Sequence, residues 1–445
     1  MTDLASPSRR SPADPVDAYE VLRRRVHGEI NTRGIDLESE GPVEDLIAEV
    51  VDDYQRRATT GLAASAPLAD LADMTARLVR SIRQFGPLTE FVTGVVEFEE
   101  LMIDGDEASY IDNQGRLVSV DEPASEDEYR SIIDKLLSGA GAAVDDRHPM
   151  VQAQVLGGTA RLGVVIPPIA DRLNATLRRY TFRKGSLTGL VSQESLSPAS
   201  ASLLGALMLA PTGIVVSGQP GAGKTTLVNA ILKAAPPAQR TIACEDTPEI
   251  QMSDLNSNRY RTRPAGPDGT GEVSLRQLVR YALGMRPDLI VVGEVRGAEA
   301  YELTRAGNAG CGLLTTLHAN SARQALEALI STAVMAGDNV NVPHVRSVFC
   351  SIIDVVVHLA REPVQVKGAG TGGIRRQVME ISAVLPPLDS GELVVTPLFL
   401  REEFGAPLQW TENPLPDDLR IRVDRALRPK GLTVHEICSG MRSLV

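Results

Sequence analysis

A glycine-rich run in the middle of the chain has the residue types and spacing to bind nucleotide phosphates. It fits G-x-x-x-x-G-K-[ST] and stands between a strand-like apolar run and a helix-like run, the context that a P-loop requires. Glycines let backbone N–H groups approach the phosphates closely. Lys224 is expected at the β and γ phosphates, and the Thr225 hydroxyl on Mg²⁺. The run comprises Gly218, Gln219, Pro220, Gly221, Ala222, Gly223, Lys224, Thr225 and Thr226.

Acidic residues follow two other apolar runs, where a hydrolytic site would need them. One run ends in Glu245, Asp246 and Glu249, another ends in Glu294, and a third is followed by His318. A carboxylate at the end of a neighbouring strand can orient or deprotonate the attacking water. Taken alone, each pattern also fits a helix cap, a turn or a structural histidine. Downstream of a P-loop, the acidic clusters are expected to belong to an active site.

As a set, these motifs resemble those of the secretion ATPases of type II and type IV systems. They are most similar to the tight-adherence pilus subgroup (TadA/CpaF-like), a relative of the VirB-type ATPases of conjugation and effector export. Residues 244–249 resemble the family's aspartate box, 285–297 its Walker B segment and 315–320 its histidine box. Residues 148–150 and 161–168 resemble the subgroup's N-terminal domain. The resemblance covers about 98–383.

The resemblance implies a RecA-like C-terminal domain hinged to an N-terminal domain, in a hexameric ring that binds ATP and Mg²⁺ between the two domains. It implies that Glu294 activates water, that Glu245, Asp246 and Glu249 help to position Mg²⁺ and water, and that His318 senses the γ-phosphate. Arginines of the N-terminal domain would neutralise charge on the transferred phosphoryl group. A plain surface charge is the alternative for any one of them. The matching positions are Arg161, Arg178 and Arg179.

The sequence also departs from the family pattern. The first histidine of the histidine box is missing from 308–312, and Gly284 stands where an arginine is expected. Gly293 occupies the place of the Walker B aspartate of many P-loop enzymes, a feature that the family shares. The four cysteines are far apart without a C-x-x-C pair, which predicts neither a zinc cluster nor a disulfide framework. These departures bear on turnover and sensing rather than on nucleotide binding.

Composition narrows the classes of partner. The net charge of −12 and the 4% aromatic content, without a basic-aromatic stretch, argue against nucleic-acid binding. The chain shows neither a signal-peptide pattern nor an apolar run of eighteen residues. We therefore expect a cytoplasmic protein, peripheral at the cytoplasmic face of the inner, or sole, membrane.

Apolar periodicity and composition divide the chain into five parts. Residues 1–15 are expected to be a disordered tail, 16–70 a helical module, 71–182 an α+β domain and 183–198 a linker. Residues 199–445 predict an α/β, RecA-like domain with a doubly wound parallel sheet. Its expected strands are 213–217, 240–245, 288–293, 312–317 and 354–359, with strand-like segments at 377–384 and 392–399 in the tail. Its expected helices are 223–234, 274–285, 297–307, 321–336, 343–353 and 417–427.

Four functions are compatible with these motifs. The first is an ATP-hydrolysing motor for pilus assembly or secretion, in which a homohexamer acts through nucleotide-driven domain closure on an inner-membrane platform protein. The second is a conjugation or effector-export ATPase of the VirB type, which the sequence separates only weakly from the first. A DNA or RNA translocase and a non-hydrolysing nucleotide-dependent scaffold are the third and fourth.

Overall fold

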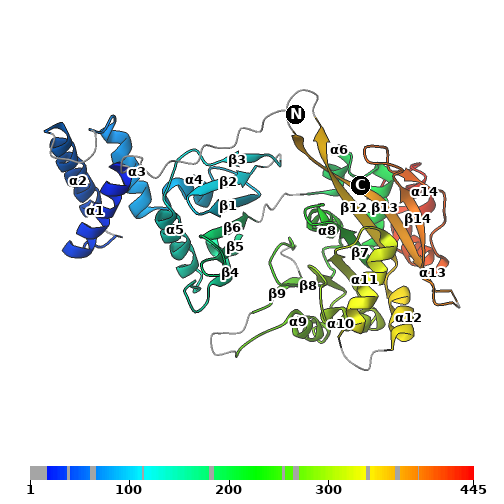
Figure 1. Cartoon of the computed structure of the whole chain (residues 1–445). Helices are drawn as coiled ribbons and strands as arrows, with labels where there is room; N and C mark the ends of the chain where they lie inside the picture. The colour runs from blue at the N-terminus through cyan, green and yellow to red at the C-terminus, as the bar shows by residue number, and fades with distance from the viewer. Residues whose placement is uncertain are drawn as a thin grey trace. The chain divides into compact units, whose positions relative to one another are not determined.

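The computed structural model describes most of the chain as two compact units, Met1–Thr181 and Phe182–Val445. In Figure 1 the first unit runs from blue to teal and the second from green to red. The tail expected at 1–15 lies outside the described residues, and each unit is described by itself. The described residues are 18–37, 41–60, 67–112, 115–179, 185–252, 256–263, 270–336, 341–365, 371–388 and 390–445.

Three helices open the first unit: α1 (Ala18–Arg33), α2 (Pro42–Thr59) and α3 (Leu71–Arg83). Apolar residues at helical spacing form one face of each helix, and these faces share a core that contains Leu22, Ile47 and Leu78. The Asp70 side chain accepts the N–H of Asp73 and so begins α3. The stripe at Leu78 and Ile82, expected in the following α+β domain, therefore packs with α1 and α2.

The rest of the first unit is a six-stranded sheet in the order β3-β2-β1-β6-β5-β4, covered by α5 (Glu126–Ser138). Within the expected α+β domain, β4 and β5 form an antiparallel hairpin, because only a short turn joins them. Strand β6 was not predicted, since it offers only two buried apolar residues. The elements are η1 (Gly86–Leu88), α4 (Thr89–Thr93), β1 (Glu100–Asp104), β2 (Glu107–Ile111), β3 (Leu117–Ser119), β4 (Met150–Val155), η2 (Leu156–Gly158), β5 (Ala160–Val165) and β6 (Asn174–Arg179).

The second unit is built on a nine-stranded mixed sheet in the order β15-β14-β13-β12-β7-β11-β10-β8-β9. Strands β12, β7, β11, β10, β8 and β9 are parallel, as the doubly wound pattern predicts. The sheet is not parallel throughout, because too few residues separate β12 from β13 for a crossover helix, and β13 returns antiparallel. The strands are β7 (Gly213–Gly218), β8 (Thr241–Glu245), β9 (Ser257–Arg261), β10 (Leu289–Val292), β11 (Gly312–Leu317), β12 (Val355–Gln365), β13 (Thr371–Leu385), β14 (Val394–Leu400) and β15 (Gln409–Trp410).

Helices cover both faces of this sheet (Figure 1). Ile214 and Val216 of β7 belong to one core, and Val215 belongs to the other, so the strand is apolar throughout. The segment expected as a linker contains α6, whose Leu187 is buried in the first of these cores. None of the described helices is long and apolar enough to cross a membrane. The helices are α6 (Leu187–Ser192), α7 (Pro198–Leu207), α8 (Lys224–Leu232), α9 (Leu275–Leu283), α10 (Glu299–Asn308), α11 (Ala322–Val334), α12 (Val342–Ile352), α13 (Asp417–Leu427), η3 (Arg428–Lys430) and α14 (Val434–Cys438).

Candidate active site

The P-loop turns from the end of β7 into the start of α8, as its sequence predicts. Gly223 is the N-cap of α8 at φ +94°, a left-handed conformation that favours glycine. A Cβ on Gly218 would stand 2.5 Å from the carbonyl oxygen of Leu359. The loop therefore needs glycine at Gly218 because neighbouring backbone is close, and at Gly223 because of its dihedral angle.

Lys224 lies at the centre of the site and is largely buried. Its Nζ donates to the carbonyl oxygens of Gly218 at 3.0 Å and Gln219 at 3.2 Å. It is also 3.2 Å from Nδ1 of His318. The P-loop lysine and the strand-end histidine, which are far apart in sequence, are thus in contact.

His318 and Glu294 meet because their strands are neighbours. Strands β7, β11 and β10 are adjacent and parallel, so their carboxyl ends meet at one edge of the sheet. Nε2 of His318 is 2.7 Å from Oε1 of Glu294. Oε2 of Glu294 accepts from Nη2 of Arg296 at 2.5 Å. A continuous polar chain therefore runs from Lys224 through the histidine and the glutamate to Arg296.

The electrostatics of Glu294 keep it ionised. Burial alone would raise the pKa of this carboxyl, but Arg296, His318 and Lys224 together lower it below its usual value. Oε1 of Glu294 is buried and has no aligned hydrogen-bond donor among the described residues, so its 2.7 Å approach to Nε2 of His318 is a close polar contact. Nδ1 of His318 lies 3.2 Å from Nζ of Lys224 and 3.2 Å from the carbonyl oxygen of Gly218, so it can accept from the first or donate to the second. Oε2 of Glu294 keeps a lone pair beside its bond with Arg296, which a water molecule could use.

A second carboxylate cluster lies on the other side of the P-loop helix start. The Thr225 hydroxyl donates to Oε2 of Glu249 at 2.9 Å. The N–H groups of Glu249 and Ile250 both donate to Oε1 of Glu245 at 2.8 Å. The Glu245 side chain thereby holds the loop that presents Glu249 to Thr225.

Glu245 differs from the other acids because it is fully buried, with 1% of its surface exposed. Burial raises its pKa to about 7, although its two N–H donors and Arg259 act in the opposite direction. Nε of Arg259, on β9, is 3.6 Å from its Oε2. A carboxyl group with this pKa can hold a proton near neutral pH.

The same burial accounts for the glycine at position 293. A Cβ on Gly293 would stand 3.1 Å from Cγ of Glu245. An aspartate side chain there would need the space that Glu245 fills, and it would add a second carboxylate to a buried site. Glu245 therefore makes a Walker B aspartate at this position sterically and electrostatically unfavourable.

The residues beside the P-loop fit Mg²⁺. Thr225 and Glu249 offer a hydroxyl and a carboxylate oxygen, the hard ligands that Mg²⁺ prefers. Mg²⁺ in such sites takes one or two protein oxygens and completes its octahedron with phosphate and water. A larger protein-only metal cluster is not found among the described residues. The donor set fits a nucleotide-bound Mg²⁺ better than a resident structural ion.

The remaining predicted residues lie at the margin or in the other unit. Asp246 is exposed, and it contributes with Glu249, after the larger effect of Glu294, to raising the pKa of Arg296. Arg161, Arg178 and Arg179 belong to the first unit, whereas the P-loop and the carboxylates belong to the second. Arg161 and Arg178 are opposite each other on β5 and β6. Arg179 donates to the carbonyl oxygen of Phe91 at 3.0 Å.

Two arginines of the site were not predicted. Arg296 lies two residues after Glu294, within residues 285–297, which resemble the Walker B segment of the family. Its closeness to Glu294 in the sequence could therefore have indicated that it belongs to the site. Arg259 lies on the edge strand β9, whose sequence Ser257–Arg261 is too polar to indicate a strand. Nothing in the sequence pairs Arg259 with Glu245.

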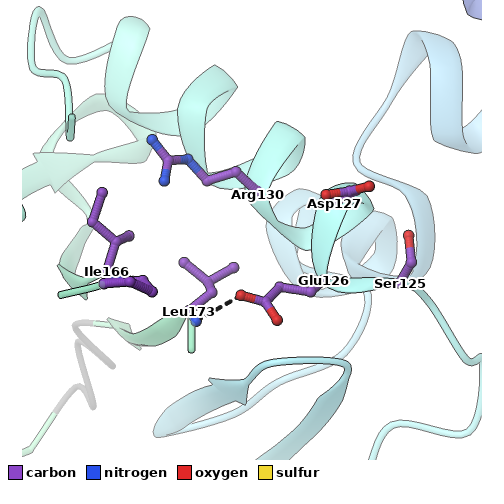
Figure 2. Close-up of a pocket in the computed structure, with 7 residues that line it drawn as sticks. Ser125, Glu126, Asp127, Arg130, Ile166 and Leu173 are labelled. Atoms are coloured by element: carbon purple, nitrogen blue, oxygen red, sulfur yellow. Dashed lines mark hydrogen bonds between the residues drawn. The ribbon is translucent and has the colours of Figure 1, made fainter. Parts of the chain in front are cut away.

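A hollow of about 440 Å³ lies in the first unit, at the start of α5. Figure 2 shows Glu126 in its wall, where this carboxylate accepts the N–H of Leu173 at 2.8 Å. Asp127 also lines it, and Arg130 is paired with Asp134 at 3.1 Å. Because its wall is rich in carboxylates, the hollow is a poor site for phosphate and we assign it no ligand.

The fold and the P-loop cluster define the class: the chain is an ATP-hydrolysing enzyme with a RecA-like α/β domain. More particularly, it belongs to the family of type II/IV secretion system proteins, whose model matches residues 143–376.

Two similar relatives carry names from conjugation, and two matching solved structures carry names from type IV secretion and pilus retraction. The chain is 36% identical over 246 residues to the putative conjugal transfer protein Rv3659c of Mycobacterium tuberculosis, covering 54% of this chain and 69% of the relative. It is 29% identical over 286 residues to the conjugal transfer protein TrbB of Rhizobium radiobacter, covering 63% and 83%. The Brucella suis VirB11 ATPase matches with a TM-score of 0.34, at 23% identity over 66% of this chain and 92% of that one. The pilus retraction motor PilT with bound ADP matches with a TM-score of 0.47, at 19% identity over 68% and 83%.

Proposed function

We propose that this ATPase is a motor for a secretion or pilus system, which works as a peripheral protein at the cytoplasmic face of the inner, or sole, membrane. Two observations support the proposal: the contacts from Lys224 through His318 to Glu294, and membership of the family of type II/IV secretion system proteins. The contacts join the group that would bind the phosphates to the group that would act on water. Binding and hydrolysis are therefore coupled through one histidine.

In the proposed reaction Lys224 binds the β and γ phosphates, and Glu294 orients the attacking water through a free lone pair. Mg²⁺, when bound at Thr225 and Glu249, would neutralise phosphate charge. His318 changes its partners when Lys224 moves onto the γ-phosphate, because Nδ1 now faces Lys224. It can thus report the presence of that phosphate to Glu294.

The finer proposal is a homohexamer of the tight-adherence pilus subgroup that acts on an inner-membrane platform protein. Arg161, Arg178 and Arg179 of the first unit would then reach the nucleotide when domains close. The support is the resemblance of residues 148–150 and 161–168 to the subgroup, and the helical module in front of the α+β domain. In the described part of the chain, no hydrogen bond or ion pair is found for the side chain of Arg161 or Arg178. Their donors are therefore available to a phosphate.

Conjugation is the second candidate, because relatives such as Rv3659c and TrbB are named conjugal transfer proteins. The discriminating experiment replaces the chromosomal gene with the Lys224→Ala or the Glu294→Gln allele in the source organism. Surface pili are then counted by electron microscopy, and transfer of a marked plasmid and the secreted proteins are measured. Loss of pili with intact plasmid transfer supports the pilus motor, and the reverse result supports conjugation.

Native mass spectrometry of the purified chain with and without ATP tests the ring. A hexamer whose ATPase activity disappears in Glu294→Gln supports a motor. A hexamer without activity in the wild type, indistinguishable from Glu294→Gln, would favour the nucleotide-dependent scaffold. Stimulation of ATP turnover by single-stranded DNA or RNA would favour a translocase.

A further inference from the structure

Strand β12 continues beside the P-loop after its partner strand has ended. It pairs with β7 from Val355 to Leu359, whose partner is Gly218, the first residue of the P-loop. The last six residues of β12, up to Gln365, therefore have no partner on β7. The chain thus places part of the β12–β13 hairpin along the flank of the phosphate loop.

Two arginines on this hairpin face the P-loop. Arg361 of β12 and Arg376 of β13 are direct partners across the two strands, so their side chains share one face. Nε of Arg376 donates to the carbonyl oxygen of Gly221 at 2.8 Å. A Cβ on Gly221 would stand 2.7 Å from Nη1 of Arg361. Both guanidinium groups therefore lie against the same turn of the P-loop.

The charge pattern of the hairpin suggests an anion at this position. The next pair along the ladder, Glu362 and Arg375, carries opposite charges. Arg361 and Arg376 carry like charges, and like charges directly opposite each other destabilise a sheet. The unfavourable pair lies beside the loop that binds phosphates, and the favourable pair lies one residue further on. An anionic ligand beside the P-loop would compensate the repulsion.

Arg361 has the donors for such a ligand. It is exposed, and no hydrogen bond or ion pair is found for its side chain in the described part of the chain. A guanidinium offers a planar fork of N–H groups that matches two phosphate oxygens. Arg376 already uses its Nε on Gly221 and is half-buried, so it positions the loop.

We infer that Arg361 is a further nucleotide-binding residue, which contacts a phosphate of the bound nucleotide from the same subunit as the P-loop. Arg376 is its positioning partner, since it fixes Gly221 against the hairpin. This inference rests on nucleotide binding by the P-loop and is independent of whether the motor serves a pilus or a conjugation system. It adds the β12–β13 hairpin to the nucleotide site.

The test compares Mg-ADP affinity of the full chain by isothermal titration calorimetry for wild type, Arg361→Ala and Arg361→Lys. Losing a hydrogen bond to a charged group at an exposed position should weaken Mg-ADP binding about tenfold in Arg361→Ala. Arg361→Lys should lose less affinity for Mg-ADP, because lysine keeps the positive charge but lacks the planar fork of N–H groups. The loss should shrink as salt is raised. The melting temperature without nucleotide should stay at the wild-type value, because Arg361 is exposed and makes no contact that the fold requires.

Arg375→Ala is the matched control, because it removes the same charge from the adjacent residue on the other face of β13. It should bind Mg-ADP as the wild type does. Wild-type affinity in Arg361→Ala, or an equal loss in Arg375→Ala, overturns the inference while leaving the nucleotide site intact. If the wild type itself does not bind Mg-ADP, both the nucleotide site and this inference are wrong.

Discussion

Replacing Glu294 by glutamine isolates the charge of this side chain, because the substitution keeps its size and one acceptor oxygen. In the wild type one carboxylate oxygen is 2.7 Å from His318 and the other is 2.5 Å from Arg296. A glutamine presents its oxygen to only one of these two neighbours, and its amide group then faces the other. The substitution therefore removes the negative charge between His318 and Arg296 and changes the group that faces one of them.

The cost to the fold should be small. Arg296 is 60% exposed, and the ion pair of such a residue contributes about 0–1 kcal/mol to stability. The melting temperature of Glu294→Gln should consequently fall by no more than about 4 °C. Nucleotide affinity should change by less than about threefold, because His318 lies between Glu294 and Lys224.

The cost to catalysis should be large. General base or water-orienting groups contribute about 10²–10⁴-fold to rate, and this carboxylate is ionised and poised to accept from water. We expect kcat to fall by about that factor, which corresponds to about 3–5 kcal/mol of activation free energy. Steady-state ATP hydrolysis with Mg²⁺ and titration with a fluorescent nucleotide measure the two quantities separately.

A matched control is Glu327→Gln on α11. Glu327 also pairs with an arginine, Arg323 at 3.3 Å, but it lies on the exposed helix surface. This variant should hydrolyse ATP at the wild-type rate. Equal loss of binding and turnover in Glu294→Gln, or a kcat within about tenfold of the wild type, would refute a direct role of the carboxylate in hydrolysis.

Three further predictions concern the P-loop and the buried acid. Lys224→Ala should weaken ATP binding at least about 100-fold by titration, because several charge-assisted contacts are lost together; wild-type affinity would exclude the site. Gly218→Ala should lose about 1–3 kcal/mol of stability in urea unfolding, because its Cβ would stand 2.5 Å from the backbone of Leu359; an unchanged midpoint would show that the loop relaxes. Glu245 has a folded pKa raised from 4.5 to about 7, so its contribution to stability is present below 4.5 and falls by up to about 3 kcal/mol as pH rises to 7. Urea unfolding at pH 5 and pH 8 should show this fall in the free energy of unfolding of the wild type and a smaller fall in Glu245→Gln. An equal fall in the two proteins would contradict the raised pKa.

The central strands of the second unit were predictable, because they are buried on both faces and read as continuous apolar runs. The strand expected at 213–217 is β7 (Gly213–Gly218), and that at 312–317 is β11 (Gly312–Leu317). Apolar runs bounded by turn residues carry enough local information for this prediction. The motif residues could then be placed at the carboxyl ends of these strands.

The outer parts of the sheet were harder to predict for physical reasons. Strand β9 lies at an edge and is mostly polar, so it has neither the continuous nor the alternating apolar signal. Strand β13 returns beside β12 through a hairpin, and its direction depends on the connection rather than on its own residues. The contact of Arg376 with Gly221 joins residues 155 positions apart, for which a single sequence gives no signal.

Glu245 and Glu294 show why motif and environment must be read together. Both follow apolar strands that are neighbours in the sheet, so the sequence gives them the same kind of position. The structure separates them: Arg296, His318 and Lys224 together lower the pKa of Glu294 despite burial, whereas burial dominates at Glu245 and raises its pKa to about 7. Acids whose environments push their pKa values apart take different chemical roles. We therefore infer that Glu294 acts on water as a carboxylate, and that Glu245 holds the Glu249 loop and crowds position 293.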